Sequence, residues 1–254
     1  MTEAPNGVLP IDKPLGWTSF DVVAVARGVL GARRVGHGGT LDPLATGLLP
    51  ILVGPATKFA DRLHAASKVY AALVTFGSET TTDDREGSTT RVADVPALTS
   101  DALDTALEAF RGPVAQVPPA FAAVKVDGRR AYSRARSGET MELAARPVTI
   151  ERLAIASWET GTLRLLVVCS TGTYIRSLAR DIGRAVGSAA HLGGLRRLAV
   201  GSLTVDDALS VETLRAAPQA AVRLRDADDR ILPLAERFRE APATELLSSW
   251  GQST

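Results

Sequence analysis

The sequence is short of the residues that mark secreted, membrane-spanning or single-strand-binding proteins. Among its 254 residues Cys169 is the only cysteine, so no disulfide can form within the chain and a disulfide-stapled scaffold is excluded. Aromatic residues make up 5% of the chain, too few for a wide surface on which successive bases stack. No apolar run approaches the roughly 18 residues of a membrane-spanning helix. Because residues 1–7 also have no signal-peptide pattern, we expect a cytoplasmic protein that contacts no membrane.

The composition that remains is that of an ordinary globular protein. Hydrophobic residues make up 45% and charged residues 22%, and the length allows one large domain or two modest ones. A net charge of +1 excludes a uniformly basic nucleic-acid binder, but it allows a basic face that is balanced by acidic residues elsewhere. Net charge therefore does not decide between function classes.

Apolar periodicity predicts helices and strands in an irregular order. Thr18 or Ser19 can cap a helix that Gly31 ends. Further helices are predicted at residues 56–65, 101–110 and 173–186, strands at 8–11, 48–53, 69–76, 121–126, 148–158, 163–169 and 198–205, and loops at 33–47 and 77–97. Because strands and helices do not alternate regularly, the sequence predicts an α+β fold with a mixed or antiparallel sheet.

The glycine-rich segment 33–50 places one aspartate on a restricted corner. Its glycines allow the backbone to approach a ligand closely, and Pro43 pushes the backbone of Asp42 towards an extended conformation. Gly, Asp and Pro are also ordinary turn residues, so the segment fits a structural turn as well as a site. A phosphate-binding loop is disfavoured because the Gly-Lys-Ser/Thr ending is missing. Spacing alone leaves the role of Asp42 open.

Five segments agree with the motifs of one known family in order and spacing. The longest is GHGGTLDPLATGLLP at residues 36–50. The others are GVLPIDKPLG at 7–16, KVY at 68–70, CSTGTYIRSL at 169–178 and HLGGLRR at 191–197. They resemble the catalytic loop, the N-terminal motif and the tyrosine, arginine and leucine motifs of the TruB family, the bacterial tRNA pseudouridine-55 synthases. The resemblance covers roughly residues 7–215.

The resemblance implies a fold, a reaction and a partner. The fold would be the pseudouridine-synthase fold, with a mixed, mostly antiparallel central sheet, flanking helices and a protruding basic insertion at 118–145. Residues 1–225 would form the catalytic domain, and 226–254 a tail that is truncated or atypical relative to the family's RNA-binding domain. The enzyme would flip uridine 55 out of the T-loop of tRNA and isomerise it to pseudouridine, without cofactor or metal. The expected partner is the T-stem-loop of tRNA, and the expected state is a monomer.

The resemblance also assigns roles to single residues. Asp42 would be the catalytic carboxylate, acting either as a nucleophile or as the base at the ribose 2′ position. Arg176 would keep Asp42 ionised, and Tyr70 would stack on the uracil and take part in the late removal of the C5 proton. Substrate contacts are implied for Lys13, His37, Gly39, Asp84 and Leu195. Contacts with the RNA backbone are expected from Arg33, Arg34, Lys125, Arg129, Arg130, Arg134 and Arg136.

Two other function classes stay open on the residues alone. A tRNA-binding chaperone without catalysis would share the fold and the basic segment, so only activity separates it from the enzyme. An aspartate-dependent glycosidase would need a second carboxylate about 5–10 Å from the first, and segment 33–50 contains only Asp42. One departure from the family pattern bears on Asp84, because residues 80–84 read TTTDD where relatives commonly show a Thr-Asp-Thr string.

Overall fold

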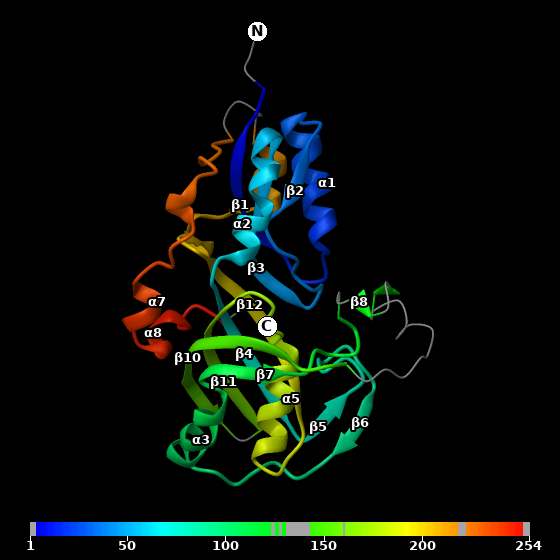
Figure 1. The fold of residues 1–254 in the computed structure, drawn as a ribbon, viewed down its shortest axis with the longest axis vertical. Coiled ribbons are helices and arrows are strands. Elements are labelled where there is room, and N and C mark those ends of the chain that lie inside the picture. Colours follow the sequence, from blue (N-terminus) through cyan, green and yellow to red (C-terminus); the bar gives the residue numbers. More distant parts are fainter. Residues whose placement is uncertain are drawn as a thin grey trace. The chain divides into compact units, whose positions relative to one another are not determined.

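The computed structural model describes residues 4–122, 125–126, 129–130, 143–159, 161–217 and 222–250. The chain forms two compact units, each made from two stretches of sequence (Figure 1). The first unit comprises Met1–Ala71 and Leu195–Ala241, and the second comprises Ala72–Gly194 and Pro242–Thr254. Two strands, β4 and β12, begin in one unit and end in the other. The predicted tail, 226–254, contributes residues to both units.

The first unit is built around a long antiparallel strand pair. Strand β1 pairs antiparallel with β3 along its whole length, and β2 pairs antiparallel with the C-terminal end of β3, residues 51–53. Residues 195–197 of β12 run parallel to β3, β14 runs parallel to β1, and β13 turns back on β12. The strands are β1 (Gly7–Lys13), β2 (Val35–His37), β3 (Ala45–Val53), β12 (Ala190–Val200), β13 (Leu203–Thr204) and β14 (Leu209–Ser210).

Helix α1 (Ser19–Leu30) forms where the sequence predicts it, and its ends explain why. The hydroxyl of Thr18 accepts a hydrogen bond from the Asp21 amide at 3.2 Å, and the Asp21 carboxylate accepts one from the Thr18 amide. Gly31 ends the helix in a left-handed conformation with φ of 59°. Its apolar face packs against β2, β3 and α6. The other helices of this unit are η1 (Gly54–Phe59), α2 (Ala60–Ala65), η3 (Val205–Asp207), α6 (Val211–Ala216), η5 (Asp229–Ile231) and α7 (Arg237–Glu240).

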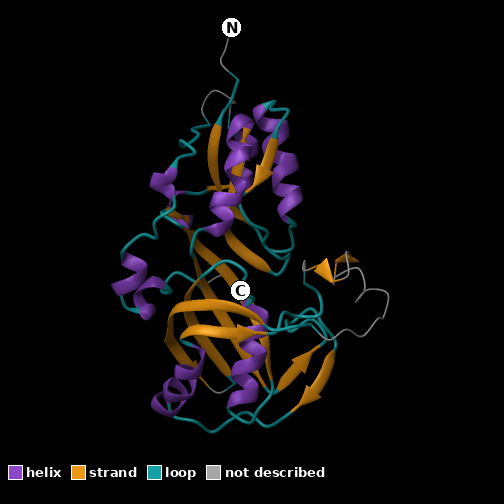
Figure 2. Ribbon diagram, viewed as in Figure 1, coloured by secondary structure: helices purple, strands orange, loops and turns teal. Residues whose placement is uncertain are grey.

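The second unit contains strands in the order β4–β11–β10–β7, and β10 is antiparallel to both of its neighbours. Helices α3 and α8 pack against β10 (Figure 2). The strands are β4 (Lys68–Phe76), β5 (Ser78–Thr80), β6 (Thr89–Val92), β7 (Gly112–Gln116), β8 (Lys125–Val126), β9 (Arg129–Arg130), β10 (Arg146–Glu159) and β11 (Thr162–Cys169). The helices are α3 (Ser100–Leu107), η2 (Glu108–Phe110), α5 (Ile175–Ala185) and α8 (Ala243–Leu246). The predicted α+β class with a mixed, mostly antiparallel sheet is confirmed.

Both predicted loops contain strands. Within 33–47 the chain forms β2 and the start of β3, and within 77–97 it forms the hairpin of β5 and β6. Strand β6 is exposed along its whole length, so it has no apolar alternation that a sequence pattern could reveal. Its pairing is supported instead by an ion pair of 2.8 Å between Arg91 and Glu79.

Three other boundaries differ from the prediction. The strand predicted at 198–205 begins at Ala190 and ends at Val200, and Leu203–Thr204 form the separate strand β13. Gly193 lies inside β12, where a Cβ would lie 2.3 Å from the hydroxyl of Thr75, so this glycine serves packing rather than a turn. The helix predicted at 56–65 is a 3-10 helix as far as Phe59. Phe121 of the predicted strand 121–126 lies in a turn, where its carbonyl accepts a hydrogen bond from Arg176.

Candidate active site

Asp42 lies in the corner between β2 and β3, partly exposed. The amide of Ala45 donates to the Asp42 backbone carbonyl at 3.0 Å, which closes a tight turn that begins at Asp42. On the preceding side, the Leu41 amide donates to the hydroxyl of Ser19 at 2.9 Å, and that hydroxyl reaches the Leu41 carbonyl at 3.2 Å. Helix α1 thus holds the residue before Asp42.

The residue after Asp42 is held from β1. The Pro43 carbonyl accepts hydrogen bonds from the Gly16 amide at 2.9 Å and from the Lys13 ammonium at 3.4 Å. Lys13 is buried, and its ammonium also donates to the carbonyls of Pro14 and Trp17. In this structure Lys13 therefore contacts the Asp42 loop, and its predicted substrate contact stays a prediction. The backbone is therefore fixed on both sides of Asp42 by groups other than its own carboxylate.

Arg197 is the third anchor of the loop. Only 1% of its surface is exposed, and its guanidinium donates to the carbonyls of Leu48 at 2.7 Å, Gly39 at 3.0 Å and Thr40 at 3.4 Å. It also hydrogen-bonds to the side chain of Tyr70. Burial lowers the pKa of Arg197, and Tyr70 opposes that shift. One buried cation thus connects the loop, β3 and the candidate stacking tyrosine.

Sequence reasoning misses what Ser19 and Arg197 do. The sequence indicates Ser19 only as a possible helix cap, and Arg197 only as the last residue of the HLGGLRR motif. A signal for Arg197 does exist in the alternation of β12, because Leu195, Arg197 and Ala199 share one face and all three are buried. The intervening Arg196 has the opposite orientation and forms a bidentate ion pair with Asp12 at 2.6 and 3.0 Å.

Three more predicted substrate contacts lie in the same unit. His37, in β2, is half-buried, and its Nδ1 accepts a hydrogen bond from the Gly39 amide at 3.4 Å. Burial lowers the pKa of His37, and the nearby charges of His64 and Arg197 lower it further, so its ring is neutral at physiological pH. Leu195 is buried in β12 opposite Ala45, and its carbonyl accepts a hydrogen bond from Thr46.

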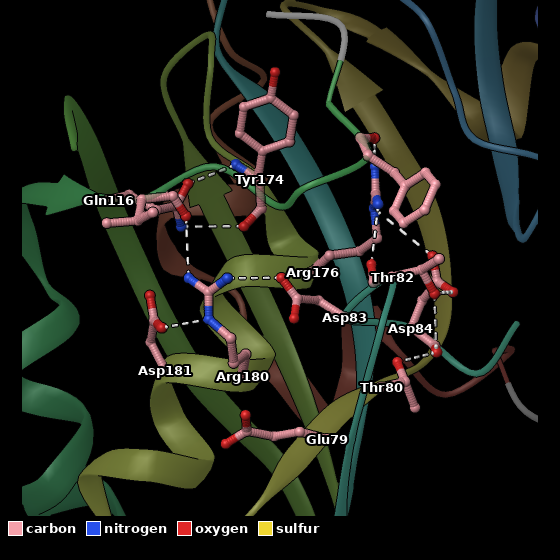
Figure 3. Close-up of polar contacts among 12 residues, drawn as sticks. Glu79, Thr80, Thr82, Asp83, Asp84, Gln116, Tyr174, Arg176, Arg180 and Asp181 are labelled. Carbon is pink, nitrogen blue, oxygen red and sulfur yellow. Dashed lines mark hydrogen bonds and ion pairs between the residues drawn. The ribbon is translucent and has the colours of Figure 1, made fainter. Parts of the chain in front are cut away.

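Arg176 lies in the second unit, in the first turn of α5, and it is buried rather than exposed. Its guanidinium donates to the carbonyls of Thr82 at 3.0 Å and Phe121 at 3.2 Å (Figure 3). Asp84 lies 3.8 Å from its Nε. The Asp84 carboxylate in turn accepts hydrogen bonds from the Thr82 hydroxyl at 2.5 Å and from the Glu86 amide at 3.0 Å.

The structure therefore groups the predicted residues into two sets. The first unit contains Asp42, Tyr70, Lys13, His37, Gly39 and Leu195, and the second unit contains Arg176 and Asp84. The pairing of Asp42 with Arg176 stays a prediction from the family resemblance.

The predicted RNA-binding residues are partly within the described chain. Arg33 and Arg34 are exposed and line a surface pocket with Pro5 and Pro55. Lys125 lies opposite Arg130 in the β8–β9 hairpin, which also contains Arg129. Arg134 and Arg136 lie outside the described residues.

Metal clusters and membrane-spanning helices are both missing from the described part of the chain. Within it, no three His, Cys, Asp or Glu residues are grouped as metal ligands. Its helices are all too short or too polar to cross a membrane.

Comparison with known proteins places these motifs in one family. Residues 27–175 match the model described as TruB family pseudouridylate synthase (N terminal domain), and residues 176–238 match the tRNA pseudouridylate synthase B C-terminal domain. A Cupriavidus taiwanensis protein named tRNA pseudouridine synthase B is 49% identical over 85% of this chain and 69% of its own length. A protein of the same name from Arthrobacter sp. (strain FB24) is 43% identical over 95% of this chain and 80% of its own.

A solved structure supports the predicted fold. A chain in a crystal structure of a Cbf5–Nop10–Gar1 complex is 31% identical, with a TM-score of 0.64 over 81% of this chain and 52% of that one. The fold predicted from the motifs is confirmed by this match. The chain belongs to the TruB family of pseudouridylate synthases, and it is an isomerase.

Proposed function

We propose that this enzyme converts uridine 55 in the T-loop of tRNA to pseudouridine. The N1–C1′ bond breaks, the uracil turns, and a C5–C1′ bond forms while the C5 proton is lost and N1 gains one. Atoms and oxidation state are conserved, so the proposed reaction uses no cofactor. The observation that carries the proposal is the Asp42 corner, whose neighbours are held by Ser19, Lys13 and Arg197.

Asp42 is the proposed reacting carboxylate. A carboxylate that attacks the ribose or the base, or removes the 2′ proton, must be aimed before the substrate arrives. Anchors at Leu41 and Pro43 fix the backbone on both sides of Asp42, so the direction in which its side chain leaves the loop is set in advance. Both chemical routes are compatible with this placement.

Arg176 is the proposed cation that keeps Asp42 ionised, a role that the family resemblance assigns to it. What favours the role physically is the state of Arg176 within its own unit, where it donates to two carbonyls and lies 3.8 Å from Asp84. Carbonyl groups carry no net charge, so these two hydrogen bonds orient the guanidinium without neutralising it. An oriented cation of this kind can act on a second carboxylate.

The uracil is proposed to be received by Tyr70 and Leu195. Its place in the RNA stack is proposed to be filled by His37. Tyr70 would stack on the flipped base and take part in removing the C5 proton, and Leu195 would form an apolar wall. His37 is suited to fill the space that the base leaves, because its lowered pKa keeps the ring neutral and planar stacking then requires no desolvation of a charge.

The decisive test maps pseudouridine in an unmodified elongator tRNA transcript after incubation with the enzyme. We expect conversion at position 55 alone, and no conversion in a matched transcript with cytidine at that position. Conversion at a different uridine would contradict the proposed position. Tight binding without any conversion would favour a tRNA-binding chaperone, and release of free uracil would favour a glycosidase.

We propose that the basic residues contact RNA phosphates, and the double variant Arg129→Gln/Arg130→Gln tests this. Binding of the transcript should weaken, and the slope of log K against log salt should become shallower by roughly 1 for each phosphate that is no longer neutralised. The control is Arg62→Gln/Arg230→Gln, which removes the same charge from residues that pair with Asp229 and Asp228. Equal slopes for the two variants would contradict the assignment. We also propose that the enzyme is a cytoplasmic monomer. A titration of the tRNA should then give one bound chain per tRNA.

A further inference from the structure

Three arginines on α5 face three acidic residues that follow β4. The arginines are four residues apart, so they lie along one side of the helix. The pairs are Arg176 with Asp84, Arg180 with Asp83, and Arg184 with Glu79. Arg176 is the proposed catalytic cation, and the other two pairs have no assigned role.

Asp83 combines burial with an unfavourable backbone conformation. Among the described residues it is the only one other than glycine with a positive φ, 59°. A left-handed residue of this kind costs on the order of 1 kcal/mol and persists only where its surroundings enforce it. The backbone of Asp83 is held by the Thr80 carbonyl and the Leu192 amide, and its side chain by Arg180, whose Nη1 donates to the Asp83 carboxylate at 2.7 Å with both side chains buried. Burial raises the pKa of Asp83, and the charge of Arg180 opposes that shift.

The strained residue stands between two of the groups that hold Arg176. The carbonyl of Thr82, before Asp83, accepts a hydrogen bond from the Arg176 guanidinium, and the carboxylate of Asp84, after it, faces Nε. Figure 3 shows these groups converging on Arg176 from one turn of the chain. The backbone conformation at Asp83 therefore contributes to where both groups lie, together with the hydrogen bonds that Thr80 and Thr82 donate to Asp84.

Arg180 also tethers a third group that holds Arg176. Its Nη2 donates to the Val117 carbonyl at 3.0 Å, four residues before Phe121, whose carbonyl binds Arg176. The neighbouring Gln116 is fixed to the start of α5, because its side-chain amide bonds to both the backbone amide and the carbonyl of Tyr174. Arg180 thus contacts both segments that carry these groups, the 82–84 turn through Asp83 and the 117–121 segment through Val117.

We propose that Asp83 and Arg180 are a positioning pair for Arg176. They hold the 82–84 turn and the 117–121 segment so that the Arg176 guanidinium has one orientation. Neither residue touches the reacting atoms. The inference rests on the proposed role of Arg176 in isomerisation and deepens it.

A merely structural ion pair would look similar, and Arg184 provides the comparison. Arg184 pairs with Glu79 at 2.6 Å on the same helix and the same segment, but its hydrogen bonds go to Glu79 and not to the groups around Arg176. Glu79 keeps a second partner, Arg91, when Arg184 is replaced. Arg184→Gln therefore removes an ion pair of the same helix without reaching Arg176, although the Arg184 side chain is more exposed than that of Arg180.

The experiment is a double-mutant cycle on single-turnover pseudouridine formation in a stem-loop RNA that contains uridine 55. Asp83→Asn keeps the shape and tolerates a positive φ, so it removes mainly the charge. We expect it to slow the reaction by about 10- to 100-fold, as a misdirected group does, with the Kd for a cytidine-55 stem-loop within about twofold of wild type. In an Arg176→Lys background, itself slow, Asp83→Asn should add less than about twofold because the two residues act as one unit.

Two further variants separate the possible outcomes. Arg184→Gln should leave the rate within about twofold of wild type. Arg180→Lys keeps the charge and can reach Asp83 or Val117 but not both, so its rate should lie below that of the wild type and above that of Asp83→Asn. This variant tests the pair even if Asp83→Asn folds poorly. A wild-type rate for Asp83→Asn, or equal losses in both backgrounds, would overturn the positioning role. An inactive wild-type enzyme would instead overturn the proposed function.

Discussion

Asp42→Asn is expected to reduce pseudouridine formation by roughly a thousandfold or more, because removal of a reacting carboxylate typically has effects of that order. The asparagine has the same shape but neither attacks a sugar carbon nor accepts a proton at neutral pH. The measurement is single-turnover conversion of uridine 55 in a tRNA transcript.

The variant should keep its fold and its affinity for tRNA. The anchors of the loop bind the backbone of Leu41, Pro43 and Thr40, and the turn at Asp42 itself is closed through its carbonyl oxygen. Each of these contacts survives the substitution. We therefore expect the melting temperature to stay close to that of the wild type, and the Kd for the transcript to change by less than about threefold.

Asp61→Asn is the matched control, since Asp61 is an exposed aspartate on α2. It should leave the rate unchanged. If Asp42→Asn retained more than about a tenth of the wild-type rate, Asp42 would not be the reacting group, and the carboxylate would have to be sought elsewhere. If the wild type and Asp42→Asn both bound tRNA and neither converted uridine, catalysis itself would be excluded.

The sequence predicts elements well where local chemistry decides them. Helix α1 has its capping residue, its apolar face and its terminal glycine within a short stretch, and all three appear as expected. The pairing of β10 with β11 likewise follows from two apolar runs around a turn. The start of β12 is not predictable in this way, because Gly193 is there for contact with Thr75, which no local pattern encodes.

The candidate site is less predictable, because burial of its charged residues depends on tertiary contacts. Without the family match, Arg176 would be expected to be a surface arginine, yet carbonyls of Thr82 and Phe121 enclose it. Arg197 is buried by carbonyls of β3 and the Asp42 loop, which are about 150 positions away in the sequence. Such arrangements satisfy the arginine through distant backbone groups, so a sequence motif can mark the residue but not its surroundings.

The largest expected loss of stability comes from Arg197→Met. Methionine fills a similar space without any donor, so the carbonyls of Leu48, Gly39 and Thr40 would lose this partner in a buried environment. Leaving buried polar groups unpaired, together with the loss of a buried cation's hydrogen bonds, should lower the free energy of unfolding by about 3–5 kcal/mol. For a chain of this size each kcal/mol corresponds to about 2–4 °C in melting temperature.

The same substitution should also loosen the Asp42 loop and release Tyr70. We expect faster amide hydrogen exchange at Leu41 and Ala45, and slow pseudouridine formation even at temperatures where the variant is fully folded. The stability and the rate of Arg197→Lys should lie between those of the wild type and of Arg197→Met, because an ammonium keeps the charge but lacks the planar fork that reaches three carbonyls. An activity loss that disappears once the variant is fully folded would show that Arg197 stabilises the fold without ordering the loop.

Arg196→Met provides the control from the neighbouring position of β12. Its bidentate pair with Asp12 is partly exposed, so its loss should change the free energy of unfolding by less than about 1 kcal/mol. Replacement of these adjacent arginines would then change the free energy of unfolding by amounts that differ several-fold, because Arg197 points into the core and Arg196 does not. If both variants unfolded at the same denaturant concentration, the carbonyls around Arg197 would have other partners, and the loop would be held mainly by Ser19 and Lys13.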